Sequence, residues 1–342
     1  MQPSRLVLDR TALVANYRWH EARAGVPLAA AVKADGYGLG ARPVVAALHA
    51  AGCRAFLVST FAEADALGHP GEGASVLVLH GFTGEEEAPL AQRLPWVRPV
   101  LSTARQVARW AAAFPGRPAD LMVDTGMNRL GLAPAEVAPA CAAVAVAVVH
   151  SHLATADEPG HPLTERQLER FREVVAATPG AAHALANSAA IAAGPRFSFD
   201  LARPGLGLYG GRPHPASDSR PVLRLEARVL QLRTVPKGAP VGYGATWTAP
   251  RPSRIATINL GYADGVPRAL APHLSFGAGD RRCPVVGRIS MDLMAVDVTE
   301  AEVSEGDWLV LEPDLARLSA RSGLSQYELL TGLARRLPRT WR

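Results

Sequence analysis

An apolar run at residues 28–32 leads to a single lysine, Lys33, followed by the glycine-rich turn 34–38. Burial lowers the pKa of a lysine, and the neutral amine can form a Schiff base with an aldehyde cofactor. The same local sequence is also typical of a strand-end lysine whose stem is buried while its ammonium reaches water. The residues alone therefore leave two interpretations of Lys33 open, a nucleophilic amine and a surface charge.

A second glycine-rich segment, residues 203–210, has the spacing GxGxxG. In a dinucleotide-binding fold this motif would open the first helix, whereas here it comes late in the chain and precedes a proline-rich stretch. Backbone N–H groups at such a position can instead hold a phosphate. Asn187 and Ser188 begin another helix-like stretch and offer a hydroxyl to the same phosphate.

Two further polar turns follow apolar runs. Asp124 and Arg129 flank one of them, and the arginine could bind a carboxylate or phenolate oxygen or simply pair with Asp124. His150 and His152 share a face of a strand, but no third ligand of clear spacing follows, so we predict no metal site. An aromatic ring packed against a planar cofactor is the better use of one of these histidines.

Three polar turns punctuated by glycine occur between residues 241 and 294. They contain Tyr243, Tyr262, and the pair Met291 and Asp292. Any one of them is typical of ordinary loop packing. Together they indicate a second face that contributes to a shared site, because binding residues are concentrated on loops.

The elements that must position these residues alternate in type over the first two-thirds of the chain. Strand-like runs separated by alanine-rich helical stretches occur at 28–32, 55–59, 75–79, 97–101, 120–124, 144–150, 182–186 and, more weakly, 197–201. This alternation predicts parallel βαβ units. Eight units in about 200 residues favour an α/β fold with an N-terminal (β/α)8 TIM-like barrel, in which chemistry lies at the carboxyl ends of the strands.

The pattern changes after a linker rich in proline and serine at residues 211–221. Strand-like runs at 223–232, 254–260, 283–286, 293–298 and 308–311 precede one terminal helix near 325–333. We therefore expect a barrel domain over residues 1–219 and a mostly β domain over residues 220–342. The first few residues are free to join the second domain.

Composition narrows the classes of function. The 342 residues are 48% hydrophobic and 20% charged, which is typical of a soluble globular protein. A net charge of +5 without a basic block argues against a nucleic-acid partner, and the longest apolar run, residues 140–149, is too short to cross a membrane. Three scattered cysteines form no metal pair or disulfide scaffold, and the start of the chain has no apolar signal, so we expect a cytoplasmic protein.

Eight motifs together resemble the alanine racemase family, whose members use pyridoxal 5′-phosphate. In chain order they are AVKADGYG, VDTGMNRLG, SHLATADE, NSAA, RPGLGLYG, VGYGATWTA, GYADGVPR and VGRISMDLM, spanning residues 31–294. The resemblance implies an isomerase that interconverts L- and D-alanine, with D-alanine biosynthesis for peptidoglycan precursors as its role. It also implies a head-to-tail homodimer, in which each site lies between one subunit's barrel and the other's β domain.

The resemblance also assigns roles to residues. Lys33 matches the lysine that binds the cofactor and acts as base for the D-substrate, and Tyr243 of the partner subunit matches the base for the L-substrate. Arg203 matches the donor to the pyridine nitrogen. The other matches to cofactor-binding positions are Tyr37, His152, Asn187, Ser188, Gly205 and Leu206. The matches to substrate-binding positions are Arg129, Tyr262, Met291 and Asp292.

Two positions depart from the family pattern. Met122 occupies the place where some members carry a carbamylated lysine that orients the active-site arginine, so Arg129 must be held in another way. Arg335 stands where some members have a phosphate-binding tyrosine. We interpret the arginine-rich end of the chain, including Arg336, as solvated surface or a phosphate contact.

Three alternatives differ in chemistry. A serine or broad-specificity racemase would use the same mechanism with another pocket. A barrel-type decarboxylase would need a carboxylate facing the pyridine nitrogen, which Arg203 argues against. A non-catalytic carrier of the cofactor would be a single barrel, leaving residues 220–342 without a purpose.

Overall fold

The computed structural model describes residues 2–342. It divides into two compact units, Leu13–Arg220 and a second unit formed by residues 2–12 with Pro221–Arg342. The first unit contains seven parallel strands paired in chain order. They are β2 (Ala29–Ala31), β3 (Ala55–Val58), β4 (Ser75–Val78), β5 (Val97–Leu101), β6 (Ala119–Met122), β7 (Val146–His150) and β8 (Ala182–Ala184). The prediction of a βα barrel with these seven strands is confirmed.

A short extended segment at residues 202–204 closes the barrel. The N–H groups of Ala29 and Ala31 donate to the carbonyls of Ala202 and Pro204, at 2.8 and 2.9 Å. On its other side, the N–H of Arg203 donates to Ala186 at 2.7 Å. The prediction of an eighth strand at 197–201 is wrong, because Pro195 starts a tight turn (Pro195–Phe197) and the extended backbone begins only after it.

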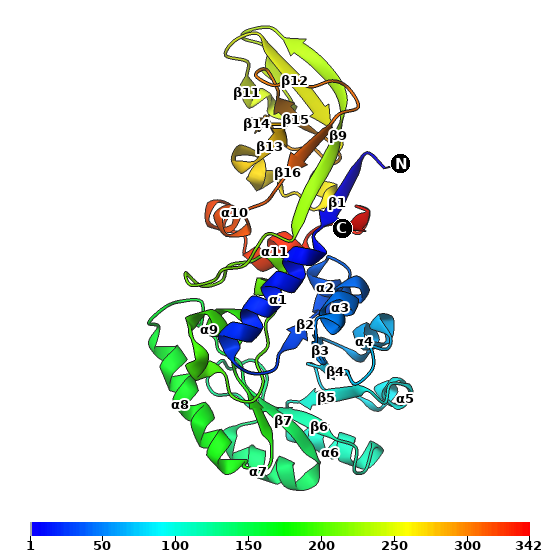
Figure 1. Ribbon diagram of the computed structural model, residues 1–342, viewed down its shortest axis with the longest axis vertical. Helices are drawn as coiled ribbons and strands as arrows, with labels where there is room; N and C mark the ends of the chain where they lie inside the picture. The colour runs from blue at the N-terminus through cyan, green and yellow to red at the C-terminus, as the bar shows by residue number, and fades with distance from the viewer. Residues whose placement is uncertain (1) are drawn as a thin grey trace. The chain divides into compact units, whose positions relative to one another are not determined.

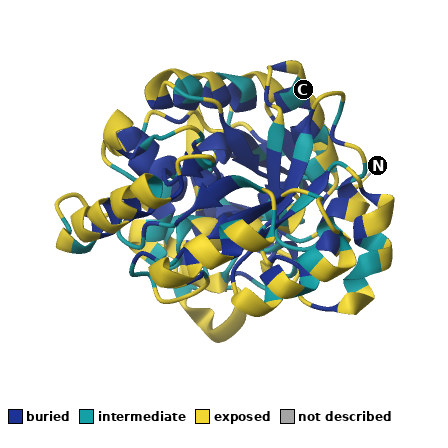
Figure 2. Ribbon diagram, turned by 90° about the horizontal axis from the view of Figure 1, so that it is seen from below, coloured by how far each residue is buried: buried dark blue, intermediate teal, exposed yellow. Residues whose placement is uncertain are grey.

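Helices follow the strands and cover the barrel from outside (Figure 1). They are α2 (Lys33–Tyr37), α3 (Ala41–Ala50), α4 (Phe61–Leu67), α5 (Ala88–Arg93), α6 (Ala104–Ala113), α7 (Pro134–Ala143), α8 (Pro162–Ala177) and α9 (Ser188–Ala193), after α1 (Arg10–Ala24). Thr60 and Thr103 cap α4 and α6 by accepting a backbone N–H in the first turn. In Figure 2 the central strands are buried and the helices alternate between buried and exposed faces. Apolar side chains of the strands therefore form the core.

The second unit is built on an eight-stranded sheet. Its order is β12 (Ser253–Ile258), β15 (Met294–Asp297), β14 (Arg281–Val286), β13 (Ser275–Ala278), β16 (Trp308–Leu311), β9 (Leu223–Val235), β1 (Ser4–Leu8) and β17 (Arg339–Trp341). β1 runs antiparallel to β9 and parallel to β17. The prediction of a mostly β domain is confirmed, with residues 4–8 as part of its sheet.

The expectation of one terminal helix in this unit is wrong, because there are two. Besides α11 (Gln326–Thr331), α10 spans Leu315–Ser322. Asp314 caps α10, while Leu315 and Leu318 are its buried side chains. α10 is only eight residues long, which is shorter than the window of about 11 to 18 residues over which a helical period is recognised.

Across residues 2–342, the longest and most apolar helices still fall short of what a membrane span requires.

Candidate active site

Lys33 lies directly after β2 and opens an unusual turn. The four residues that follow, 34 to 37, all have left-handed backbone conformations with φ between 53° and 64°. Three of the four are not glycine, and each such residue costs about 1–2 kcal/mol in this conformation. Hydrogen bonds hold the turn: Gly36 N–H donates to Val32 O, and Ala41 N–H donates to the Asp35 carboxylate, both at 2.8 Å. Backbone strain of this kind is concentrated at functional sites.

Glu63, in the first turn of α4, fastens this turn to the next strand. Its carboxylate accepts the N–H of Ala34 at 3.0 Å and the N–H of Ser59 at 2.6 Å. Sequence reasoning did not identify Glu63 as part of the site. A signal was present, because Thr60 and Glu63 have the spacing of a capping box immediately after a predicted strand.

The surroundings of Lys33 favour its neutral form. Burial lowers the pKa of the Lys33 amine, the Arg129 cation lowers it further, and the Glu63 carboxylate opposes both. The side chain is half-buried. This environment supports the interpretation of Lys33 as a nucleophilic amine over that of a surface charge.

Four of the predicted residues lie near one another at the carboxyl ends of the strands, namely Lys33, Arg129, His152 and Arg203. Burial lowers the pKa of His152 to about 3, with further contributions from the Arg203, Arg129 and Lys33 cations. His152 is therefore a neutral ring at physiological pH. The site presents amine and guanidinium groups around that ring, which suits an anionic, planar ligand.

The turn that carries Arg129 is shaped by Asp124. One oxygen of this carboxylate accepts the N–H groups of Gly126, Met127 and Asn128 at 2.8, 2.9 and 3.1 Å. The alternative of an Asp124–Arg129 ion pair is therefore wrong. Within the part of the chain that the structure describes, no hydrogen bond or ion pair joins the exposed Arg129 side chain to another residue.

The two segments predicted to share a phosphate do meet. Ser188, the first residue of α9, is buried, and its hydroxyl oxygen accepts the N–H of Gly205 at 2.9 Å and of Gly207 at 3.2 Å. The Ser188 hydroxyl keeps its own proton for a further acceptor. Asn187 caps α9 by accepting the N–H of Ala190 at 3.0 Å.

Tyr37 lies on the other side of this segment. Its ring stacks on Tyr209 with 4.6 Å between centroids, and Tyr209 donates its hydroxyl to Ala31 O. Leu206 opens the 3-10 turn Leu206–Tyr209, and its N–H has no acceptor among residues 2–342. A hydroxyl proton and a backbone N–H thus remain in one small region.

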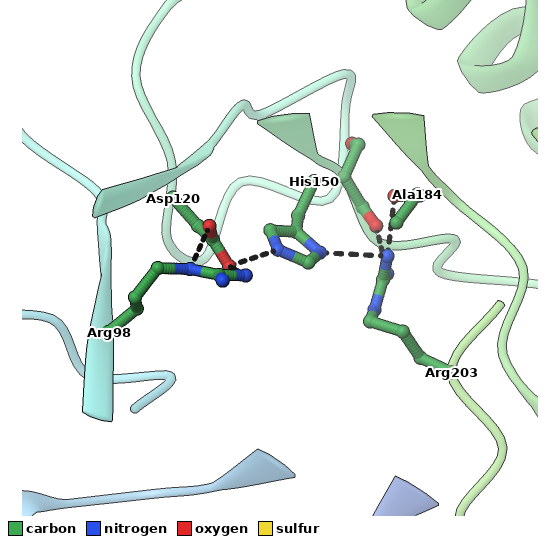
Figure 3. Close-up of polar contacts among 6 residues, drawn as sticks. Arg98, Asp120, His150, Ala184 and Arg203 are labelled. Atoms are coloured by element: carbon green, nitrogen blue, oxygen red, sulfur yellow. Dashed lines mark hydrogen bonds and ion pairs between the residues drawn. The ribbon is translucent and has the colours of Figure 1, made fainter. Parts of the chain in front are cut away.

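Arg203 is buried and held by carbonyl groups (Figure 3). Its Nη1 donates to Ala184 O and its Nη2 to Ser151 O, while Nη1 also lies 3.3 Å from His150 Nδ1. Among the described residues, its Nε donates to no protein acceptor. Burial lowers the pKa of Arg203 to about 10, so the guanidinium remains charged at neutral pH with one N–H to offer.

The remaining predicted residues belong to the second unit. Tyr243 begins the 3-10 turn Tyr243–Ala245 and is 71% exposed. Tyr262 begins another short turn, and its N–H donates to Ser290 O at 3.0 Å. The next N–H, that of Ala263, donates to Met291 O at 2.9 Å. The turns that carry Tyr262 and Met291 are therefore side by side, and both side chains are exposed.

Asp292 is tied to the end of the chain. Arg336 donates from Nε to the buried Asp264 at 2.6 Å and from Nη2 to Asp292 at 2.7 Å. Arg336 is exposed, in agreement with the interpretation of the tail as solvated surface, and it also bridges two carboxylates of its own unit. Arg335 is exposed beside it.

Comparison with known proteins follows the same division of the chain. The family model described as "Alanine racemase, N-terminal domain" matches residues 8–213, and "Alanine racemase, C-terminal domain" matches residues 222–341. A protein of Methylobacterium sp. (strain 4-46) named "Alanine racemase" is 43% identical over 360 residues, covering 99% of this chain and 97% of that protein.

Solved structures give the same result. The alanine racemase of Bartonella henselae, crystallised with covalently bound pyridoxal phosphate, has a TM-score of 0.90 and 34% identity, covering 100% of both chains. The biosynthetic alanine racemase of Pseudomonas aeruginosa has a TM-score of 0.87 and 36% identity, again covering 100% of both chains.

Proposed function

Because the chain belongs to the alanine racemase family, we propose that it is an isomerase that interconverts L-alanine and D-alanine with pyridoxal 5′-phosphate. The observation that carries this proposal is the placement of Lys33. Its amine has a lowered pKa and lies at the strand ends beside the cationic Arg129 and the neutral His152.

The residues present fit this cofactor. The Ser188 hydroxyl, the Leu206 N–H and Tyr37 would hold the phosphate, and Lys33 would bind the aldehyde carbon. The free Nε–H of Arg203 would donate to the ring nitrogen. When bound, the cofactor withdraws electrons and stabilises the negative charge that develops at Cα of the amino acid.

Racemisation needs a proton removed from one face of Cα and a proton returned on the other. One base on each face is the minimal solution. We assign these bases to Lys33, for the D-substrate, and to Tyr243 of the partner subunit, for the L-substrate. A tyrosine ordinarily has a pKa of about 10, so neighbouring positive charge must assist it.

Arg203 accounts for the choice of reaction. An arginine does not give up its proton, so Arg203 would leave the ring nitrogen of the cofactor unprotonated, and the ring would then withdraw electrons weakly. A weak electron sink limits the lifetime of the charged Cα and discourages other reactions. This argues against a decarboxylase, which would place a carboxylate there.

A homodimer with shared sites is part of the proposal. Tyr243, Tyr262 and Met291 are exposed aromatic or apolar side chains on turns of the second unit, which suits coverage by a partner. Three free cysteines suit a reducing cytoplasm, where D-alanine would serve peptidoglycan precursors. Serine or a range of larger amino acids is the alternative substrate, and a panel of L-amino acids followed by chiral chromatography decides between them.

The chain's composition makes the central test sharp. It contains two lysines, Lys33 and the exposed Lys237. Borohydride reduction of the protein with its cofactor should add the cofactor's mass to the peptide containing Lys33 and leave the Lys237 peptide unchanged. Lys33→Ala should abolish conversion of L- to D-alanine, whereas the control Lys237→Ala should keep it. Label on Lys237, or an active Lys33→Ala, would contradict the proposal.

A further inference from the structure

A row of polar side chains runs from β5 across β6 and β7 to Arg203, which lies in the closing segment beyond β8 (Figure 3). Arg98 on β5 donates to both oxygens of Asp120 on β6, at 2.9 and 3.3 Å. Asp120 lies 3.1 Å from Nε2 of His150 on β7, whose Nδ1 lies 3.3 Å from Nη1 of Arg203. Asp120 and His150 are fully buried.

The partners of His150 determine its tautomer. Arg203 has only donors, so His150 Nδ1 must accept and carries no proton. The proton therefore lies on Nε2 and is donated to Asp120. Burial lowers the pKa of His150, the Asp120 carboxylate opposes this, and the two arginines lower it further. The ring is thus a neutral donor on one side and an acceptor on the other.

The acceptor at His150 Nδ1 matters because it helps to engage the terminal nitrogens of Arg203 and leaves the Arg203 Nε–H free. His150 and the carbonyl groups of Ala184 and Ser151 occupy the terminal nitrogens of Arg203. With both ends engaged, the guanidinium plane cannot rotate, and Nε–H keeps one direction. No carboxylate reaches Arg203 itself among its hydrogen bonds in the described residues, since Asp120 acts through the neutral ring.

We propose that His150, oriented by Asp120 and Arg98, is a positioning residue that fixes the direction of the Arg203 Nε–H toward the cofactor's ring nitrogen. The inference rests on the proposed function and extends it to His150, Asp120 and Arg98. Asp120 accepts the Nε2 proton of His150. The unprotonated Nδ1 of His150 then accepts from Arg203 and fixes the direction of the Arg203 Nε–H.

Substitutions at position 150 separate positioning from packing. Gln can keep the donor toward Asp120, and Phe fills the space, but neither offers an acceptor where Nδ1 lies. Asn can place its amide oxygen there. For Gln and Phe we expect kcat to fall about 100-fold, with KM and the Kd for pyridoxal 5′-phosphate within about threefold; Asn should recover about tenfold of that loss. The visible absorption band of the bound cofactor should shift in Gln and Phe and return toward wild type in Asn.

His183 on β8 is a matched control. It is also buried and also bonds an aspartate, with Nδ1 at 3.3 Å from Asp200, but it does not contact Arg203. His183→Gln should leave the absorption band and kcat within about threefold of wild type. If the position 150 variants follow side-chain volume, with Phe best and Asn worst, or if His183→Gln shifts the band equally, the proposal is overturned.

Asp120→Asn provides an independent test with no change of shape. In either orientation its NH2 group would face an N–H donor, that of Arg98 Nε or that of His150 Nε2, so the band should shift and kcat should fall in the direction seen for His150→Gln. The nitrogen NMR spectrum of the wild-type holoenzyme should contain a histidine signal that is missing from the spectrum of His150→Asn. That signal should report an unprotonated Nδ1. A protonated Nδ1, or an unchanged Asp120→Asn, contradicts the inference. A wild-type protein that binds no cofactor would instead refute the proposed function.

Discussion

Gly205 and Tyr37 pack so closely that no side chain fits between them. A Cβ atom on Gly205 would lie 2.3 Å from the Tyr37 hydroxyl oxygen and 3.3 Å from the Cβ of Ala31. The same glycine donates its N–H to Ser188. The proposed phosphate site of Ser188, Leu206 and Tyr37 therefore depends on a residue without a side chain at position 205.

Gly205→Ala should push Tyr37 out of its stack on Tyr209. We expect the free energy of unfolding to fall by about 1–3 kcal/mol because the site is overpacked. The Kd for pyridoxal 5′-phosphate should rise by about tenfold or more. Titration of the apoprotein and urea unfolding measure the two effects. Gly180→Ala, where nothing lies within 4 Å of the new Cβ, is the control. Equal cofactor affinity in both variants would remove Tyr37 and Gly205 from the phosphate site.

Tyr243→Phe should leave the cofactor bound and reduce exchange of the Cα proton of L-alanine. Loss of a general base costs about 100-fold or more. Exchange of D-alanine with solvent deuterium should be less affected, because Lys33 serves that face. Mass spectrometry of each isomer in deuterated buffer measures both rates, with Tyr327→Phe, another exposed tyrosine, as the control. Equal losses from the two isomers would point to a structural role for Tyr243.

Glu63→Gln and Arg129→Gln should shift the pH dependence of cofactor binding in opposite directions. Only the neutral Lys33 amine reacts with an aldehyde, so the association rate falls as pH drops through its pKa. Glu63 raises that pKa and Arg129 lowers it. The midpoint should therefore move to lower pH in Glu63→Gln and to higher pH in Arg129→Gln.

Stopped-flow mixing of apoprotein with pyridoxal 5′-phosphate measures these midpoints. Glu302→Gln, an exposed carboxylate in the other unit, should leave the midpoint in place. Shifts of the same sign in the two variants would show that Lys33 does not sense these charges.

Arg336→Gln should disturb Asp292 and destabilise the second unit. The substitution leaves the buried Asp264 without its cation and frees Asp292 to move. We expect a lower Tm and a higher KM for alanine, with a smaller change in kcat. Arg335→Gln, the exposed neighbour, is the control. An unchanged KM with a lowered Tm would limit Arg336 to a structural role.

The sequence predicted the elements whose signals are local. Lys33 was located because an apolar run ends there, and seven barrel strands were found from apolar runs that alternate with helical stretches. The eighth strand was misplaced because its position is set by partners at Pro27–Ala31, about 170 positions earlier. Only the folded chain brings those partners to it.

The parts of the site that were missed are those held by distant contacts. Arg336 meets Asp264 across 72 positions and His150 meets Arg203 across 53. No spacing rule links such pairs in one sequence. Glu63 differs, because its capping pattern was visible while its role beside Lys33 was not.

The pairing of β1 constrains the order in which the chain can fold. This strand is synthesised before both of its neighbours in the sheet, which begin at Leu223 and Arg339. All of Leu13–Arg220 is made in the interval, so the barrel can form while β1 still has open hydrogen-bonding edges on both sides. In a nascent chain that ends before Leu223, β1 would therefore be an unpaired strand that can pair with other chains and aggregate. A chaperone that covers this strand would prevent that aggregation.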